Sequence, residues 1–274
     1  MGKEKPKYYK VENYIFKNFK AVEQFQYLIT NYNFNFDKSR KEVITAGLNE
    51  DLDVRYYAKP EYNWMQMEEI RSGLKDGLDV HLYAIPLFNW VQMSEISQGL
   101  KQNLNVEIYC NPDFNDEQMK QIRLGLEKKL NVEIYAKPEF NQGQMRQIRK
   151  GLEKNIDISL YAKPEFDWRQ MELIRLGLEQ SLDVSSYINI EFNCYQMGII
   201  REGLEKGLDV SIYATTEFYH QQMKQILLGL EKEIDVSSYL NPGIHWKEME
   251  KVRLELESEK EHGSFNKNNL YSRR

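Results

Sequence analysis

The chain has 274 residues, of which 41% are apolar and 29% charged, and its formal net charge is −5. Acidic and basic side chains are mixed along the chain, and the absence of a basic tract argues against nucleic acid as a partner. The first residues lack the apolar run of a signal peptide, and no segment approaches the roughly 20 apolar residues of a membrane span. Cys110 and Cys194 lie in unrelated contexts, which argues against a disulfide framework or a zinc knuckle. Composition therefore predicts a cytoplasmic protein that does not contact a membrane.

Residues 1–35 are predicted to form an N-terminal cap, because they do not fit the pattern of the rest of the chain. Their apolar residues are spaced as on one face of an amphipathic helix. These residues are Phe16, Phe19, Val22, Phe25 and Leu28.

A 26-residue repeat follows, and it is the strongest signal in the sequence. Glycine followed by leucine recurs at this period without a slip, and methionine and tyrosine form two further columns. The glycines are Gly47, Gly73, Gly99, Gly125, Gly151, Gly177, Gly203 and Gly229. The tyrosines are Tyr57, Tyr83, Tyr109, Tyr135, Tyr161, Tyr187, Tyr213 and Tyr239. Units are predicted to start near 36, 62, 88, 114, 140, 166, 192 and 218, with a partial unit from 244.

Each unit is predicted to begin with a long helix of about three turns. In the unit 62–87, Asn63 is a good N-cap, and Met67, Ile70 and Leu74 follow at helical spacing. The run ends at Gly77.

A second, shorter helix is predicted after the long one. Asp79 can cap it, Val80 and Tyr83 share one face, and Pro86 is expected to stop it. The rival interpretation makes this segment a strand, but strand alternation would expose the recurrent tyrosine. The helical period therefore explains the recurrent positions better.

A three-turn helix with one apolar stripe is not stable alone, so neighbouring units must stack their stripes into a continuous core. The predicted fold is all-α, an α-solenoid of about eight helix–turn–short-helix repeats over residues 36–257. Residues 258–274 are polar and predicted to be a disordered tail.

The glycine column lies inside the long helix, where each glycine costs roughly 0.5–1 kcal/mol relative to alanine. The sequence contains no phosphate-binding glycine motif. Close approach between stacked helices is therefore the predicted reason for the column.

An arginine column leaves two interpretations open. Arginines at this spacing could form a ladder that binds a small anion, and the candidate residues are Arg123, Arg149, Arg175 and Arg201. Pairing with recurrent acids is favoured, because a phosphate-binding stripe is not usually answered by carboxylates in the same units. The acids are Glu61, Asp113, Glu139, Glu165, Glu191 and Glu217.

Two sets of residues are candidates for contact with a partner. The first lies on the short helices: Tyr56, Leu82, Ile108, Ile134, Leu160 and Ile212. It forms either an apolar binding surface or half-buried contacts between adjacent short helices. The second set, Trp64, Trp90 and Trp168, shares the first position of the long helix with polar residues of other copies. These tryptophans are either exposed binding anchors or half-buried packing residues.

The consensus of the unit is YAKPEFxWxQMxxIRxGLExxLDVSxY, and residues 161–187 match it closely. It resembles short helical repeats in uncharacterised proteins of Gram-positive gut bacteria and their mobile elements. The resemblance covers residues 36–257 and implies no activity. Lys41, Ile190 and Thr216 depart from the consensus.

Catalytic motifs are missing from the sequence, and its four histidines are scattered, so no enzymatic activity, metal or cofactor is expected. The leading hypothesis is a scaffold that recruits, sequesters or inhibits a protein partner. The resemblance adds interference with a host or rival enzyme as one form of it. The alternative is a receptor or sponge for a small anionic ligand such as a nucleotide, since the repeat symmetry breaks around Ile190, Thr215, Thr216, Tyr219 and His220. The sequence leaves the oligomeric state open.

Overall fold

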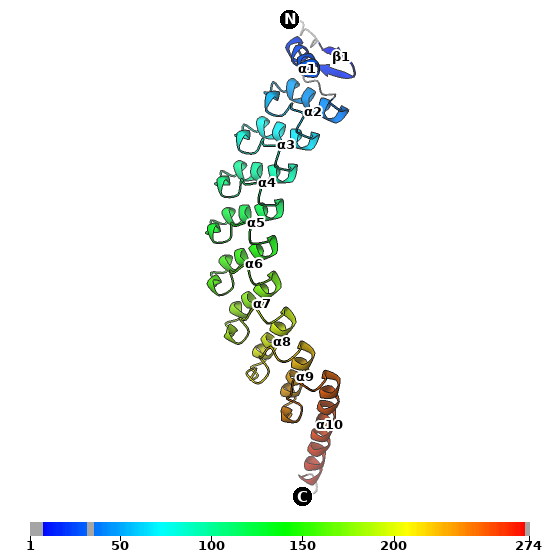
Figure 1. Ribbon diagram of the computed structural model, residues 1–274, viewed down its shortest axis with the longest axis vertical. Helices are drawn as coiled ribbons and strands as arrows, with labels where there is room; N and C mark the ends of the chain where they lie inside the picture. Colours follow the sequence, from blue (N-terminus) through cyan, green and yellow to red (C-terminus); the bar gives the residue numbers. More distant parts are fainter. Residues whose placement is uncertain (1–7, 32–35, 272–274) are drawn as a thin grey trace. The chain divides into compact units, whose positions relative to one another are not determined.

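The computed structural model describes residues 8–31 and 36–271. The chain divides into two compact units, residues 1–145 and 146–274, which are treated separately. Within each unit the long helices follow one another in chain order (Figure 1).

The first unit opens with an antiparallel hairpin of β1 (Tyr9–Val11) and β2 (Tyr14–Phe16), in which Lys10 lies opposite Ile15. Its long helices are α1 (Phe19–Asn31), α2 (Lys38–Asn49), α3 (Trp64–Lys75), α4 (Trp90–Lys101) and α5 (Asp116–Glu127). Its short helices are η1 (Val54–Tyr56), η2 (Val80–Leu82), η3 (Val106–Ile108) and η4 (Val132–Ile134). The boundary between the units falls within α6 (Gln142–Glu153).

The second unit continues with the long helices α7 (Trp168–Glu179), α8 (Cys194–Glu205), α9 (His220–Glu231) and α10 (Trp246–Tyr271). Its short helices are η5 (Ile158–Leu160), η6 (Val184–Ser186) and η7 (Val236–Ser238). In the described chain, a turn rather than a short helix connects α8 to α9.

The all-α repeat solenoid predicted from the sequence is confirmed. In the first unit α2, α3, α4 and α5 pack in succession, and in the second α7, α8, α9 and α10 do the same. The recurrent Tyr, Met, Ile and Phe side chains fill the core between them, as the stacking of apolar stripes requires.

The long helix starts as predicted. The Asn63 side chain accepts hydrogen bonds from the backbone N–H groups of Met65 and Gln66, and the Gln66 side chain accepts from the backbone N–H of Asn63. This capping box satisfies N–H groups that have no partner inside the helix. The first turn is therefore determined locally, before any packing.

Gln66 also joins one repeat to the next, which the sequence analysis missed. Its Nε2 donates to the carbonyl oxygen of Phe88 at 2.7 Å. The same bond recurs in Gln92–Phe114, Gln118–Phe140, Gln170–Phe192, Gln196–Phe218 and Gln222–Ile244. One glutamine therefore caps its own helix and fixes the loop that leads into the following helix.

The long helix ends in a left-handed residue. Gly77 has φ of +70°, and the backbone N–H of Leu78 reaches back to the carbonyl of Gly73 at 2.9 Å, as in a Schellman motif. Most other copies hold this conformation without glycine: Asp51, Asn103, Lys129, Asn155, Ser181 and Glu233.

The left-handed residues predict a stabilising substitution. Lys129 is exposed and has φ of +57°, a conformation that costs a side chain roughly 1–2 kcal/mol and glycine nothing. We expect Lys129→Gly to stabilise the protein by about 0.5–1 kcal/mol, measured as a higher midpoint of thermal unfolding. Lys129→Ala keeps the Cβ atom and should leave the midpoint unchanged, so equal effects of the two substitutions would contradict this explanation.

The short element is helical, as predicted, but it is a 3₁₀ helix of three residues. Asp79 caps it by accepting from the backbone N–H of His81, and Val80 and Tyr83 are buried. Pro86 does not stop this helix, because η2 already ends at Leu82. The proline lies in the following turn, whose carbonyl groups Gln66 binds.

The glycine column was correctly assigned to packing, but the predicted neighbour was wrong. A Cβ atom on Gly73 would lie 1.7 Å from the hydroxyl of Tyr83, in the same repeat. In most repeats this tyrosine donates to the helix carbonyl four residues before the glycine, as Tyr109 does to Glu95 at 3.1 Å. The glycine thus makes room for a tyrosine from the following turn rather than for the neighbouring long helix.

The two ends differ from the prediction. Phe16 lies in β2 and Phe19 is exposed, so the N-terminal helix begins later than predicted and a hairpin precedes it. The core face of α1 is formed by Ala21, Val22, Phe25 and Leu28. At the other end α10 continues to Tyr271, so residues 258–271 are helical rather than disordered. The remainder of the predicted tail, and residues 1–7 and 32–35 of the cap, lie outside the described residues.

Candidate binding edge

The candidates predicted on the short helices are half-buried: Tyr56, Leu82, Ile108, Ile134, Leu160 and Ile212. Ile212 lies in the turn between α8 and α9 rather than on a short helix. Successive turns touch one another, since the Tyr56 hydroxyl lies 3.0 Å from His81 Nε2 and the Cys110 thiol donates to the carbonyl of Leu82 at 2.8 Å. Their geometry therefore fits the second interpretation, contact between adjacent short helices, and not an open apolar surface.

The tryptophan column is more accessible. Trp64 and Trp90 are 46% and 43% exposed, and Trp168 is also exposed. Each is the first residue of its long helix, held in place by the capping box before it. These tryptophans are exposed rather than half-buried, and their role as binding anchors stays a prediction.

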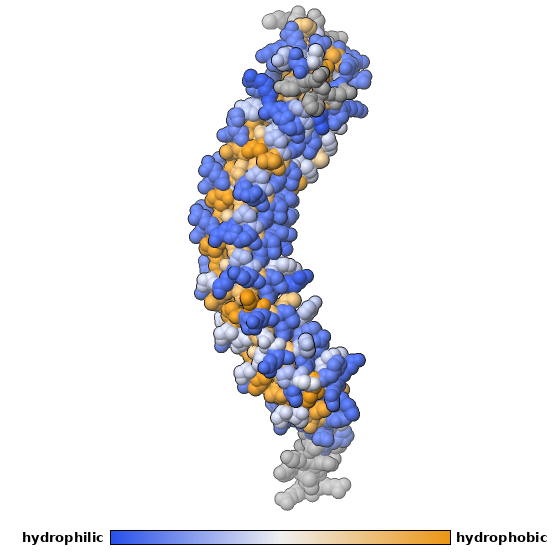
Figure 2. Space-filling view, in the orientation of Figure 1, coloured by the Kyte–Doolittle hydropathy of each residue, from blue (hydrophilic) through white to orange (hydrophobic). Residues whose placement is uncertain are grey.

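Other apolar residues join the tryptophans along what we call the helix-start edge: the loop before each long helix together with that helix's first turn. In the first unit these are Ile85 and Leu87, the latter 77% exposed. Gln66 donates to the carbonyls on both sides of Leu87, which places this loop against the first turn of α3. Figure 2 shows apolar surface interrupting the charged surface over the repeats.

In the second unit the exposed apolar side chains of the helix-start edge are Trp168, Ile190, Tyr195 and Tyr219. The guanidinium of Arg169 lies over the Trp168 ring, 4.4 Å from its centre.

Sequence reasoning missed Ile85, Leu87 and Tyr195. The signal was present, because Leu87 replaces the acid found at the equivalent position of most other copies, and Ile85 stands where the other copies carry lysine, asparagine or threonine.

The arginine column forms ion pairs, but the predicted partners were wrong. Arg123 pairs with Glu95 of the preceding repeat at 2.7 Å and with Glu127 one turn further along its own helix. The one-turn pairing recurs in Arg149–Glu153, Arg175–Glu179, Arg201–Glu205 and Arg253–Glu257. Among the described residues, no acid of the Glu61 column pairs with these arginines.

Arg71, of the same column, pairs with Glu50 of the preceding repeat, and this contact lowers the pKa of the Glu50 carboxyl. Burial alone would raise the pKa of Glu50, but hydrogen bonds from Lys75 and Arg71 hold it below its ordinary value. Because Arg123 and Arg175 are buried against internal partners, the guanidinium groups of the proposed anion site are already neutralised within the protein.

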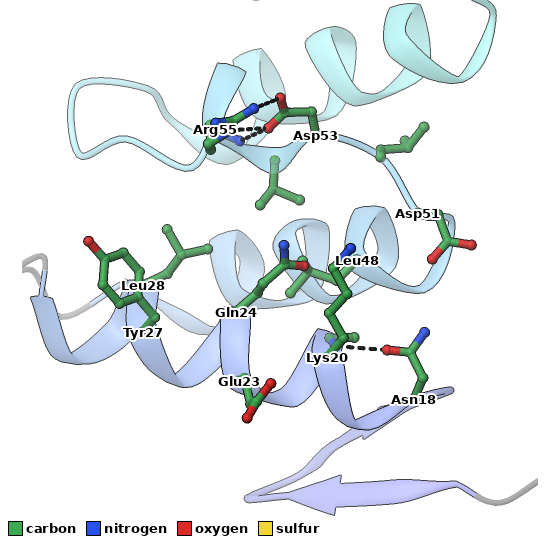
Figure 3. Close-up of a pocket in the computed structure, with 13 residues that line it drawn as sticks. Asn18, Lys20, Glu23, Gln24, Tyr27, Leu28, Leu48, Asp51, Asp53 and Arg55 are labelled. Atoms are coloured by element: carbon green, nitrogen blue, oxygen red, sulfur yellow. Dashed lines mark hydrogen bonds and ion pairs between the residues drawn. The ribbon is translucent and has the colours of Figure 1, made fainter.

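A groove of about 780 Å³ lies between α1 and the loop that follows α2 (Figure 3). No short helix in the described chain precedes η1, so the outer side of η1 faces this groove. Its charges are mixed and partly paired: Arg55 binds Asp53 at 2.6 Å, and Asp51 binds Lys17 at 2.6 Å. The groove therefore does not select a ligand of one charge.

Within residues 8–31 and 36–271 no cluster of histidine, cysteine and acidic side chains is arranged to hold a metal ion. Over the same residues, no helix has the length and apolar character needed to cross a membrane.

Fold and edge together define a class, an all-α repeat solenoid with exposed apolar side chains where its long helices begin. Comparison with known proteins finds no matching family, no matching curated protein and no matching solved structure.

Proposed function

We propose that this protein is a non-catalytic scaffold that binds a protein partner through its helix-start edge. The observation that carries the proposal is the exposure of Trp64, Leu87 and Trp90 on one part of that edge. The helical frame does not require these side chains, because other copies fold with acids at the equivalent positions, as with Glu139 for Leu87 and Asp116 for Trp90.

Exposed tryptophan and leucine are costly in water unless something covers them, and tryptophan is among the residues that contribute most to protein interfaces. The segment 85–91, IPLFNWV, has no charged residue, whereas the edge segments of the other repeats each have at least one. An uncharged apolar centre with polar surroundings is the usual anatomy of a protein interface.

Substituting exposed apolar residues of the helix-start edge should abolish partner binding and leave the protein folded. Leu87→Glu/Trp90→Asp introduces residues that other copies already carry at these positions. We therefore expect the free energy of unfolding to change by about 1 kcal/mol or less. Partner binding should be abolished, because a carboxylate at the centre of an apolar interface loses its water without gaining a counter-charge. Affinity capture from the cells that produce the protein measures partner binding, with mass spectrometry of captured proteins and of extracted small molecules. A thermal melt of the same variant measures its stability.

The matched control is Asn105→Asp/Asn131→Asp. It adds the same two negative charges at the caps of η3 and η4, where other repeats carry aspartate. This variant should capture the same protein as the wild type. Capture of a small anion and no protein, or equal capture by both double variants, would contradict the proposal.

A further inference from the structure

Two exposed tyrosines distinguish the helix-start edge of the second unit. Tyr195 and Tyr219 are 67% and 73% exposed, and the Tyr195 ring stacks on His220 with centres 5.1 Å apart. Gln196 donates to the carbonyl of Phe218 at 2.8 Å, which fixes the loop containing Glu217 against the start of α8. Tyr195, Glu217, Tyr219 and His220 therefore form one surface from two adjacent repeats, here called the tyrosine patch.

Tyr219 occupies the N-cap position of α9, where several other repeats have asparagine. Asn63, Asn89, Asn115 and Asn193 cap the long helices from this column, whereas the Tyr219 side chain makes no cap hydrogen bond. Losing such a cap costs a helix about 1 kcal/mol. A tyrosine that is mostly exposed recovers little of that cost by packing, so the residue contributes something other than stability to this surface.

At other helix starts, in the first unit and in the second, aromatic rings hold a cation from their own chain. Lys59 lies over Tyr62, Arg169 over Trp168 and Lys247 over Trp246, at 4.4–6.0 Å from the ring centres. Near the tyrosine patch the lysine column is interrupted, since Asn189 and Thr215 stand where Lys163 stands one and two repeats earlier. No cation of the described chain lies over Tyr195 or Tyr219.

The charge of the patch is negative. Glu217 is the one acidic residue in the segment 215–221, TTEFYHQ, which contains no lysine or arginine. It is exposed and makes no ion pair with the residues that the structure describes. The Tyr219 ring and the face of Tyr195 that does not stack on His220 lie beside an unpaired carboxylate. Together they complement a cationic side chain, which gains from the ring faces and from the negative charge.

From this geometry we infer that the tyrosine patch binds a lysine- or arginine-containing segment of a partner protein, with the cationic side chain over the rings of Tyr195 and Tyr219 and its charge facing Glu217. The inference rests on the proposed scaffold function and names the chemistry of one of its partner sites.

The test uses fluorescein-labelled hexalysine as the probe, with the full chain titrated at low ionic strength and binding followed by fluorescence anisotropy. Fully acetylated hexalysine has the same backbone without the charges and should not bind. Tyr195→Ser/Tyr219→Asn should weaken hexalysine binding by about tenfold or more, since cation–π contacts at such sites are worth this much. Because Tyr219→Asn restores the missing cap, the thermal midpoint should rise, and unfolding then cannot explain the loss.

Two controls separate the patch from the general acidity of the chain. Glu217→Gln should weaken binding several-fold, whereas Glu139→Gln should not, because Glu139 holds the same column position beside Lys137 and without neighbouring tyrosines. Tyr8→Ser/Tyr27→Ser removes two equally exposed tyrosines of the first unit and should have no effect.

Four results would each overturn the inference. The first two are undiminished binding by the tyrosine-patch variant and equal losses in Glu217→Gln and Glu139→Gln. The others are tight binding of the acetylated peptide and no binding of hexalysine up to about 1 mM. The scaffold proposal fails separately. If hexalysine does not bind but a protein is still captured and is lost on Leu87→Glu/Trp90→Asp, only the cationic site is wrong.

Discussion

Gly151→Ala is expected to destabilise the protein by about 3 kcal/mol, although glycine to alanine inside a helix ordinarily stabilises. The added Cβ atom would lie 2.0 Å from the Tyr161 hydroxyl and 2.8 Å from Cγ2 of Ile158, both fully packed in the same repeat. Tyr161 cannot move away cheaply, because its ring is buried and its hydroxyl donates to the carbonyl of Gln147 at 3.3 Å. The loss should appear as a lower midpoint of thermal unfolding followed by circular dichroism.

Gly198 provides the control, since it lies inside α8 and a Cβ atom there would meet nothing within 4 Å. Gly198→Ala should stabilise by about 0.5–1 kcal/mol. Adding Tyr161→Phe to Gly151→Ala removes the closest clash and should recover part of the loss, which a double-mutant cycle measures. Independent, additive effects of the two substitutions would show that the tyrosine hydroxyl is not the reason for the glycine.

Unfolding between about pH 10 and 12 is the second large effect that we expect. Burial raises the pKa of the column tyrosines above the ordinary value, reaching about 12 for Tyr239 and higher for Tyr109 and Tyr161. The neutral phenol is thus favoured in the folded state. Its contribution to stability is complete below pH 10 and is lost as the pH rises toward the folded-state pKa, because the unfolded chain releases its protons first.

Each such tyrosine lowers the free energy of unfolding by about 1.4 kcal/mol per pH unit in this window, and at least seven column tyrosines have a pKa raised by burial. Tyrosinate absorbance at 295 nm should therefore rise together with the loss of helical circular dichroism. Tyr187→Phe should make stability depend less steeply on pH, by the contribution of one tyrosine. Ionisation of the column with the helical signal intact would refute the role of burial.

The repeat, its period and its helical character could be read from the sequence because they are local. The Asn63 cap, the helical spacing of Met67 and Ile70, and the Asp79 cap each depend on residues within one or two turns. Stacking of the units followed, since an isolated three-turn helix is unstable.

Partner choice between and within repeats needed the tertiary structure. Gln66 looked like one more polar helix residue, and only the position of the following loop shows it bound to the carbonyl of Phe88. Arg123 had several acids at plausible spacing, and the stacking of α4 on α5 selects Glu95. In both cases the sequence contains more hydrogen-bond donors and acceptors than the structure pairs. The three-dimensional arrangement decides which of them lie close enough to form a hydrogen bond or ion pair.

The candidate site divides in the same way. The sequence made Leu82 and Trp90 equally good candidates for partner binding. Amino-acid type predicts a preference for burial, but it does not predict how far a given side chain is buried. The packing of neighbouring turns half-buries Leu82, whereas Trp90 remains accessible at the first turn of α4. Sequence alone determined the repeating frame of this protein, since that frame rests on short-range caps and periodicity. Tertiary structure alone decided which side chains reach solvent, since exposure depends on neighbours 20 to 30 residues away in the chain.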